Sequence, residues 1–446
     1  MISHSFPIRQ IKGIASSWIA YPIAEHLEKR DIGSKLRELR RHYKIDFKAR
    51  REIARKRLVE TLEFCDAQVP YYTDLFRSIG FTPSKLEKDS NYLLDLPLLT
   101  KEIIREQGDR LLSAKLGDIR HHERKTGGST GLSCVIFYDQ PSLDYSAAVT
   151  LYTRERVGKK KSHPELHFAC RFPDAPPEKR FDRESMKCFA MNRSNIFFDR
   201  LDHEGLEEIW QTLRDRKPML AHAHPSTMYA LACYIGEKYG GGRAFDVFES
   251  SGELLEPHMR KAIEKNLRCR VVDRYGLAEF GVMAYEFGSN RQAPLQFLDS
   301  EGWPESRESD HGMHELVISG FRNRLMPLIR YATGDQARVV ETEEGFFLTD
   351  IIGRIHDIVP IGGVSYPTHH IQDILDHRVG GIQEFQIDLR TSPSTLRIVP
   401  EPHADIEEIK RKIHAFWGDA LTLLFVNHNQ MIRVGGRSKF RHVVTA

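Results

Sequence analysis

The sequence predicts a protein of the α/β and α+β class, with a large N-terminal domain of mainly parallel sheets flanked by helices and a small C-terminal α+β domain. Strand-like and helix-like segments alternate between residues 165 and 288, which is the pattern of βαβ units. Short strands dominate after residue 315, and 446 residues exceed the size of one hydrophobic core. We expect the large domain to span residues 1–352, with a helical lead-in over about 1–80, and the small domain to span 353–446.

The lead-in is predicted from residues 35–66, which are rich in Arg, Lys, Glu and Leu at helical spacing and contain no Pro or Gly. Thr82-Pro83 and Thr100 are typical helix starts. Residues 173–187 and 299–312 are rich in proline or charge and are expected to be surface loops. The alternating region is expected to hold strands 166–170, 219–223, 245–250 and 270–273, and helices 203–216, 226–239 (capped by Ser226) and 257–266.

The tail from residue 353 is expected to contain helix 368–377, strands 385–389 and 396–399, helix 406–416 and strand 421–426.

Composition excludes several classes of protein. A net charge of +3 is too small for a dedicated nucleic-acid binder. No run of about 18 apolar residues predicts an integral membrane segment, and no secretory leader is visible.

Two features leave more than one interpretation open. The amphipathic stretch 11–27 predicts a helix that either lies on the protein body or touches a membrane surface. Six scattered cysteines without a Cys-x-x-Cys pair favour buried thiols in a reducing, cytoplasmic setting, and a catalytic thiol is the alternative. Three histidine pairs occur, but none has a third ligand at helical spacing, which argues against a zinc site. A homodimer is left open.

A Gly/Ser/Thr loop is the first candidate site, and its residues are Thr126-Gly127-Gly128-Ser129-Thr130-Gly131. Its hydroxyls and backbone N–H groups could wrap phosphates. Leu132 and Ser133 follow it, so it lacks the Gly-Lys-Ser/Thr of a Walker P-loop. Val135–Tyr138 then reads as a strand, which places the loop between two strands. Taken alone, the loop could also be a flexible turn.

Two further candidates follow predicted strands, where open α/β sheets bind ligands. The first is Ser251-Gly252-Glu253, whose glycine would let a flat ring approach the backbone. The second is Tyr275-Gly276-Leu277-Ala278-Glu279, in which Tyr275 could stack on a base. Glu279 could hold a magnesium ion that bridges phosphates. The alternatives are a strand-ending turn for the first and a helix N-terminus with an acidic first turn for the second.

Three candidates lie nearer the C-terminus. Asp335 follows Thr333-Gly334 in an expected tight turn and could accept hydrogen bonds from a ribose diol, although Gly-Asp is also a common hairpin pair. Arg354 and the pair Gly362-Gly363 lie where the composition changes, which suits a hinge or an ordinary linker. Lys439 stands in a basic, glycine-flanked tail. Lys439 would have a catalytic role only if the tail folds back over a bound nucleotide. Its ammonium would then neutralise the charge that develops on the α-phosphate and carboxylate oxygens.

In this order, these motifs resemble the adenylate-forming superfamily of acyl-CoA synthetases and related ligases. Within it, the chain is most similar to the short branch of phenylacetate–CoA ligases and capsule-biosynthesis adenylating proteins. The resemblance runs from about residue 50 to the end and includes two further stretches, Val69-Pro70-Tyr71-Tyr72 and Leu96–Lys101.

The resemblance implies a role for each motif. Thr126, Ser129 and Thr130 would bind phosphate, with Gly127, Gly128 and Gly131 in the same loop. Ser251, Gly252 and Glu253 would face the adenine, on which Tyr275 would pack beside Gly276. Glu279 would bind Mg²⁺, Asp335 would hold the ribose with help from Arg354, and Lys439 would be the adenylation lysine. Gly363 would belong to the loop that turns toward the acceptor when the small, mobile domain rotates.

The implied reaction joins a carboxylic acid to AMP from ATP, releases pyrophosphate and transfers the acyl group to the thiol of coenzyme A. Two positions depart from the family pattern. Leu132-Ser133 stands where the family often has Lys-Pro, and His356 stands where the hinge residue is usually Asp or Lys. The second departure leaves open an amine acceptor, which would give an amide in polysaccharide or secondary-metabolite biosynthesis. A non-catalytic nucleotide-binding relative is the third alternative.

Overall fold

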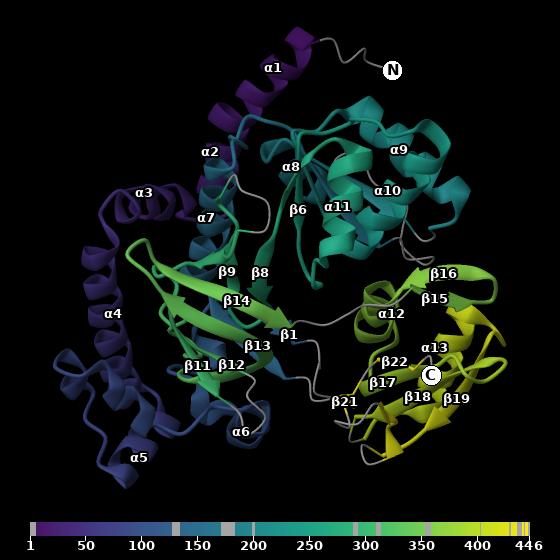
Figure 1. The fold of residues 1–446 in the computed structure, drawn as a ribbon. Helices are drawn as coiled ribbons and strands as arrows, with labels where there is room; N and C mark the ends of the chain where they lie inside the picture. Colours follow the sequence, from purple (N-terminus) through teal and green to yellow (C-terminus); the bar gives the residue numbers. More distant parts are fainter. Residues whose placement is uncertain are drawn as a thin grey trace.

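The computed structural model describes residues 6–126, 134–170, 183–198, 201–288, 293–308, 314–352, 358–401, 403–427, 430–434, 439–440 and 442–444. Figure 1 shows N-terminal helices along one side, two large sheets at the centre, and the C-terminal residues gathered in a lobe of their own. None of the described helices is both long and apolar enough to span a membrane.

The helical lead-in is confirmed. Its elements are α1 (Phe6–Ala15), a π-helical turn η1 (Ser16–Ala20), α2 (Tyr21–Leu27), α3 (Ile32–His42), α4 (Phe47–Gln68) and α5 (Pro70–Ile79). The carboxylate of Asp46 caps α4 by accepting a hydrogen bond from the Ala49 N–H at 2.8 Å. Thr100 caps α6 (Lys101–Gln107) as predicted, whereas Thr82-Pro83 opens a short 3₁₀ helix, Pro83–Glu87.

The alternating region forms a five-stranded sheet in which all neighbouring strands are parallel, as predicted. The strand order is β4 (Arg193–Phe198), β3 (Glu165–Cys170), β5 (Leu220–Ala223), β6 (Val247–Ser250) and β7 (Arg270–Val272). The helices are α7 (Gln140–Arg156), α8 (Arg183–Ala190), α9 (His203–Arg216), α10 (Pro225–Tyr239) and α11 (Pro257–Leu267). One sheet face packs on α9, α10 and α11, and the other faces α7 and α3. The predicted loop 173–187 is wrong at its end, because α8 begins at Arg183.

The second large sheet has seven strands, and all of its neighbouring strands are antiparallel. The strand order is β11 (Gly302–Glu308), β12 (His314–Gly320), β13 (Tyr331–Glu341), β14 (Phe346–Ile352), β10 (Leu295–Phe297), β9 (Gly281–Tyr285) and β8 (Arg274–Leu277). The predicted loop 299–312 is wrong, since it contains β11. Pro304 and the charges of β11 suggest a loop, but the strand lies at the sheet edge, where proline is tolerated.

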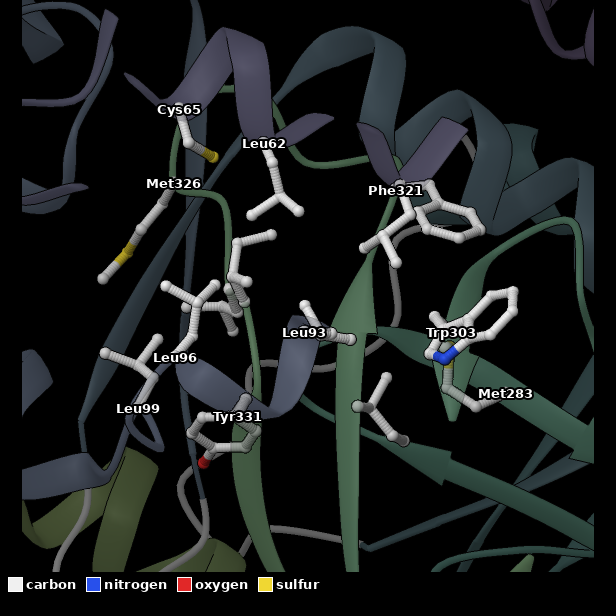
Figure 2. Close-up of a cluster of buried hydrophobic side chains, with 14 of the residues drawn as sticks. Leu62, Cys65, Leu93, Leu96, Leu99, Met283, Trp303, Phe321, Met326 and Tyr331 are labelled. Carbon is white, nitrogen blue, oxygen red and sulfur yellow. The ribbon is translucent and has the colours of Figure 1, made fainter. Parts of the chain in front are cut away.

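A buried cluster joins the lead-in to the antiparallel sheet. Figure 2 shows Leu62 and Cys65 of α4 above Leu93, Leu96 and Leu99, with side chains of the sheet region around them: Met283, Trp303, Phe321, Met326 and Tyr331. Leu62 and Cys65 are fully buried. The backbone of Leu99 exchanges hydrogen bonds of 3.0 Å with Arg330 and Ala332. This packing holds β13 in place, and β13 carries Asp335.

The C-terminal lobe has a hydrophobic core drawn from residues between Val359 and Val443. Its predicted sequence of helix, two strands, helix and strand is confirmed. The elements are β15 (Ile358–Ile361), β16 (Val364–Pro367), α12 (Thr368–Ile374), β17 (Ile382–Asp388), β18 (Ser394–Pro400), α13 (Ile406–Trp417), β19 (Leu421–Phe425), β20 (Arg433–Val434), β21 (Lys439–Phe440) and β22 (Val443–Val444). The main sheet has the order β19-β18-β17-β22. The two-residue strands β20, β21 and β22 are too short to leave a periodic pattern in the sequence.

Candidate nucleotide-binding site

One pocket gathers predicted site residues from three separate stretches of the chain. Its empty space, including the adjoining open solvent, is about 780 Å³. The predicted residues that line it are Gly252, Glu253, Tyr275, Gly276, Glu279 and Asp335. Gly252 and Glu253 follow β6. Tyr275 and Gly276 lie in β8, and Glu279 lies in the turn after it. Asp335 lies in β13. The pocket therefore adjoins the carboxyl end of the parallel sheet, where ligands bind in open α/β folds.

Tyr275 and Asp335 meet directly, although 60 residues separate them. The Tyr275 hydroxyl donates a hydrogen bond to Asp335 Oδ2 at 2.9 Å. Burial and the neighbouring Asp335 raise the pKa of Tyr275 well above its ordinary value, so the phenol stays protonated and donates. This bond fixes the orientation of the carboxylate beside an aromatic ring.

Asp335 does not follow a hairpin turn, contrary to expectation. It lies inside β13, whose pairing with both neighbouring strands is irregular near this point. Gly334 has a φ of +79°, which favours glycine. The Thr333 hydroxyl accepts a hydrogen bond from the Asp335 N–H at 3.1 Å and donates to the Leu316 carbonyl at 2.8 Å. A bulge of this kind re-aims a side chain out of the regular strand.

Glu279 is almost fully buried, at 4% exposure. It lies in the turn between β8 and β9, so the alternative of a helix N-terminus is wrong. The Tyr331 hydroxyl donates to Glu279 Oε1 at 2.7 Å. Glu279 also borders a second hollow, which Arg124, Tyr138 and Arg322 help to line. The carboxylate therefore stands between two hollows.

The Ser251-Gly252-Glu253 turn packs closely against the start of α10. Gly252 has a φ of +85°, and a Cβ there would lie 2.4 Å from the His224 ring, so the position requires glycine. Glu253 accepts hydrogen bonds from the Ser226 N–H and hydroxyl, both at 3.0 Å. The expected cap by Ser226 is wrong, because Ser226 is the second residue of α10 and Glu253 supplies the capping acceptor. Glu253 thus fixes the turn to α10.

The Gly/Ser/Thr loop joins β1 (His121–Lys125) to β2 (Val135–Asp139), an antiparallel pair that confirms the predicted strand–loop–strand arrangement. Gly127, Gly128, Ser129, Thr130 and Gly131 lie outside the described residues. Thr126 is 1% exposed, and its hydroxyl accepts a hydrogen bond from the Cys134 N–H at 3.0 Å. This hydrogen bond links Thr126 and Cys134, the residues at the two ends of the loop.

The lobe that carries Lys439 lies beside this hairpin. The Lys125 ammonium donates to Glu401 Oε1 at 2.9 Å and to the Ile382 carbonyl at 3.4 Å. Lys439 pairs with Val434 in the small β20–β21 hairpin, and its side chain lies outside the described part of the structure. Both ends of this hairpin are anchored on β17, by two 2.8 Å bonds between Gln386 and Ile432 and by β22.

The remaining predicted residues lie in the sequence near the start of the C-terminal lobe. Arg354 and His356 lie outside the described residues. Gly362 and Gly363 form the turn of the β15–β16 hairpin with φ values of +58° and +83°. A Cβ built on Gly363 would meet nothing within 4 Å, so the turn is open to solvent on that side.

A buried ionic network behind the pocket was not predicted. Arg154 of α7 bonds to Glu249 at 2.7 Å and to Glu165 at 3.1 Å, and each of these side chains is at most 2% exposed. Arg274, which lines the pocket, lies 3.4 Å from Glu249. Burial alone would raise the pKa of Glu249, but Arg154 and Arg274 outweigh it and hold that pKa well below its ordinary value. The sequence signal that could have indicated this network is Glu249, which directly follows the apolar pair Val247-Phe248 in the predicted strand 245–250.

Comparison with known proteins identifies relatives of low but extended similarity. No family model matches the chain. Protein CapK of Staphylococcus aureus is 23% identical over 318 residues, which cover 69% of this chain and 68% of CapK. Phenylacetate-coenzyme A ligase of Escherichia coli strain K12 is 23% identical over 419 residues, which cover 86% of this chain and 92% of the ligase.

Solved structures show the same fold across almost the whole chain. 2-Hydroxyisobutyryl-CoA ligase in the thioesterification state gives a TM-score of 0.59 at 18% identity, with 91% of each chain covered. The same enzyme in the postadenylation state gives 0.56 at 17% identity and the same coverage.

The chain therefore has the fold of this solved acyl-CoA ligase, which agrees with the superfamily that its ordered motifs resemble. Among the named relatives, it is similar in sequence to phenylacetate–CoA ligase and to CapK.

Proposed function

We propose that this chain is an ATP-dependent ligase that activates a carboxylic acid as an acyl-adenylate, releases pyrophosphate and transfers the acyl group to coenzyme A. The observation that carries the proposal is the single pocket in which a glycine-backed turn, an aromatic ring and two fixed carboxylates converge. Relatives and structural neighbours named as CoA ligases support the same reaction. ATP and coenzyme A are cytoplasmic substrates, so the proposed activity places the chain in the cytoplasm.

The pocket residues suit a bound nucleotide. The adenine would lie against Gly252 and the ring of Tyr275, and Asp335, held by Tyr275, would accept hydrogen bonds from the ribose hydroxyls. Loop 126–131 and Arg354 would complete the phosphate and ribose contacts. A hard cation such as Mg²⁺ prefers one or two carboxylates together with phosphate oxygens, and the buried carboxylate of Glu279 fits that donor set. When bound, the ion would neutralise phosphate charge.

Lys439 would complete the site once the C-terminal lobe closes over the nucleotide. We propose that residues 353–446 move as one domain about a hinge at 353–357, because this lobe has its own core. The Lys125–Glu401 ion pair joins the lobes through side chains that are 24% and 42% exposed. Exposed ion pairs stabilise little, so this contact would not prevent rotation. Rotation would then turn Gly363 and its hairpin toward the thiol.

A panel of carboxylic acids tests this proposal. Acid-dependent exchange of labelled pyrophosphate into ATP should appear with at least one aryl, fatty or hydroxy acid. ATP binding without exchange for every acid would instead favour the non-catalytic alternative. Product identification with coenzyme A or with amines then separates thioester from amide formation, the alternative that His356 left open.

Glu279 gives the first specific prediction. Glu279→Gln keeps an acceptor for the Tyr331 hydroxyl but removes the charge, so exchange at low Mg²⁺ should fall by about 100-fold and the Mg²⁺ requirement should rise. The measurement is the exchange rate as a function of Mg²⁺ concentration. Tyr331→Phe is the matched control, because it removes the 2.7 Å bond and leaves the carboxylate. An unchanged Mg²⁺ dependence in Glu279→Gln would exclude Glu279 as the ligand.

A further inference from the structure

The helices α1 and α2, with the π-helical turn η1 between them, carry a stripe of large apolar side chains that faces outward. Figure 1 shows α1 projecting beyond the sheets toward the N-terminus. The stripe consists of Ile11 (66% exposed), Ile14 (56%), Trp18 (76%), Ile19 (61%), Ile23 (54%) and Leu27 (71%). The sequence left open whether this stretch lies on the body or touches a membrane. The helix does pack on the body, but through its other face.

The inner face is made mostly of small side chains, together with the buried side chain of Tyr21. Gly13, Ser16 and Ser17 are buried. A Cβ on Gly13 would lie 2.2 Å from the Ser162 carbonyl oxygen, so the helix backbone lies very close to the body. A surface helix ordinarily buries its large apolar residues and exposes polar ones. Here the arrangement is reversed, so the described part of the protein leaves the apolar stripe uncovered.

The π-helical turn keeps the stripe on one face. Ile11, Ile14 and Trp18 follow helical spacing, and Ile19, Ile23 and Leu27 follow it again one residue later. In a continuous α-helix the two sets would differ by about 100° in direction. The turn Ser16–Ala20 accommodates the extra residue, because its hydrogen bonds span five residues. All six side chains are consequently exposed together.

Basic residues border this stripe. Lys12 follows Ile11 directly in α1, and burial, followed by the charge of Arg216, lowers the pKa of Lys12. The acid on α2, Glu25, accepts a hydrogen bond from the Gly33 N–H at 2.6 Å. Positive charge beside an apolar stripe is complementary to an anion.

A second helix extends the same surface. The helix α8 lies against η1 and α2. It exposes Met186 and Phe189, at 63% and 47%. Lys187, whose side chain is 53% exposed, lies between them in the sequence.

We propose that this surface, formed by α1, η1, α2 and α8, binds the face of an anionic phospholipid bilayer. Its apolar side chains would enter the interface, with Trp18 at the headgroup level, and Lys12 and Arg216 would meet lipid phosphates. A second copy of the chain is a poorer partner, since an isologous interface would bring identical basic residues together. The proposal is independent of the reaction assigned to the pocket.

Tryptophan fluorescence tests it directly. Trp18 is 76% exposed, whereas Trp210, Trp303 and Trp417 are at most 7% exposed. Addition of phosphatidylcholine vesicles containing phosphatidylglycerol should therefore shift the emission to the blue and co-sediment the protein. Pure phosphatidylcholine vesicles should bind it more weakly, and salt should weaken binding to the anionic vesicles.

Amino-acid substitutions separate the contribution of the apolar stripe to vesicle binding from that of the basic residues. Trp18→Ser combined with Ile23→Ser should weaken co-sedimentation by about tenfold or more, and Lys12→Gln with Arg216→Gln should remove the preference for anionic vesicles. Leu94→Ser, at an apolar residue 58% exposed elsewhere, is the matched control and should bind like the parent. Absence of vesicle binding, or binding unchanged in the Trp18/Ile23 variant, would overturn the proposal. A dimer that dissociates in that variant, without vesicle binding by the parent, would assign the stripe to self-association instead.

Discussion

Replacing Lys439 with alanine is expected to lower the rate of acyl-adenylate formation by roughly 10²–10³, the cost of losing one donor aimed at transition-state charge. The ammonium would neutralise charge on the α-phosphate and carboxylate oxygens as they approach. The β20–β21 hairpin that carries Lys439 is anchored at both ends on β17. This anchoring would let the lobe deliver the lysine to a defined position, which is what catalysis by positioning requires.

Single-turnover measurement of acyl-AMP formation gives the rate, and transfer from preformed acyl-AMP to coenzyme A gives the second step. The substitution should slow the first step far more than the second, because the lysine neutralises charge that develops during adenylation, and the proposed rotation of the lobe would withdraw it before AMP leaves in transfer. Lys410→Ala is the matched control, since Lys410 lies in the same lobe on α13 with its side chain 46% exposed. Full adenylation activity in Lys439→Ala would remove the lysine from the mechanism.

Breaking the buried ionic network is expected to have the largest effect on stability. Glu249→Gln leaves the buried Arg154 with Glu165 alone, and Glu165 also pairs with the buried Lys159. Removal of one partner from a buried pair destabilises a fold by roughly 3–5 kcal/mol. Urea unfolding measures this loss. The double variant Arg154→Met with Glu249→Leu should recover only part of it, because it removes the lone charge of Arg154 but still leaves Arg274 and the Tyr285 hydroxyl without Glu249.

The sign of the pH dependence follows from the low pKa of Glu249. A carboxylate whose pKa is depressed by folding stabilises the fold above its unfolded pKa, about 4.3 for glutamate, and loses that contribution as the pH falls further. The difference between wild type and Glu249→Gln should therefore be full at neutral pH and shrink below about pH 4. The exposed pair Glu408–Arg411 is the control, and Glu408→Gln should leave the unfolding midpoint unchanged. A Glu249→Gln protein as stable as wild type would contradict the network's role.

Local patterns in the sequence predicted four of the five strands of the parallel sheet, because β5 and β6 are each followed directly by a helical segment, but they missed the edge strand β4 and the helix α8 before it. They failed where pairing depends on distant residues. The strand β11 contains Pro304 and several charges, and it becomes a strand only because β12 pairs with it. The strands β20, β21 and β22 have two residues each, which leaves no period to detect.

The candidate site likewise combines residues that the sequence indicates with contacts that only the fold creates. Resemblance to a family indicated Tyr275 and Asp335 as separate motifs, and only the fold brings them within 2.9 Å. Glu253 was expected to face adenine, but its bonds to Ser226, 27 residues away, could not be read from local spacing. The ion pair of Arg154 and Glu249 spans 95 residues for the same reason. Long-range partners of charged residues are therefore what the sequence leaves out.

The central claim is that a carboxylate oxygen attacks the α-phosphate of ATP. The most direct test uses an acid that supports pyrophosphate exchange, labelled with ¹⁸O in its carboxyl group, in a complete reaction with coenzyme A. Attack by the carboxylate, followed by thioester formation, leaves one acid oxygen on the phosphate, so the account predicts AMP that carries a single ¹⁸O. Unlabelled AMP, or ADP as the nucleotide product, would contradict it.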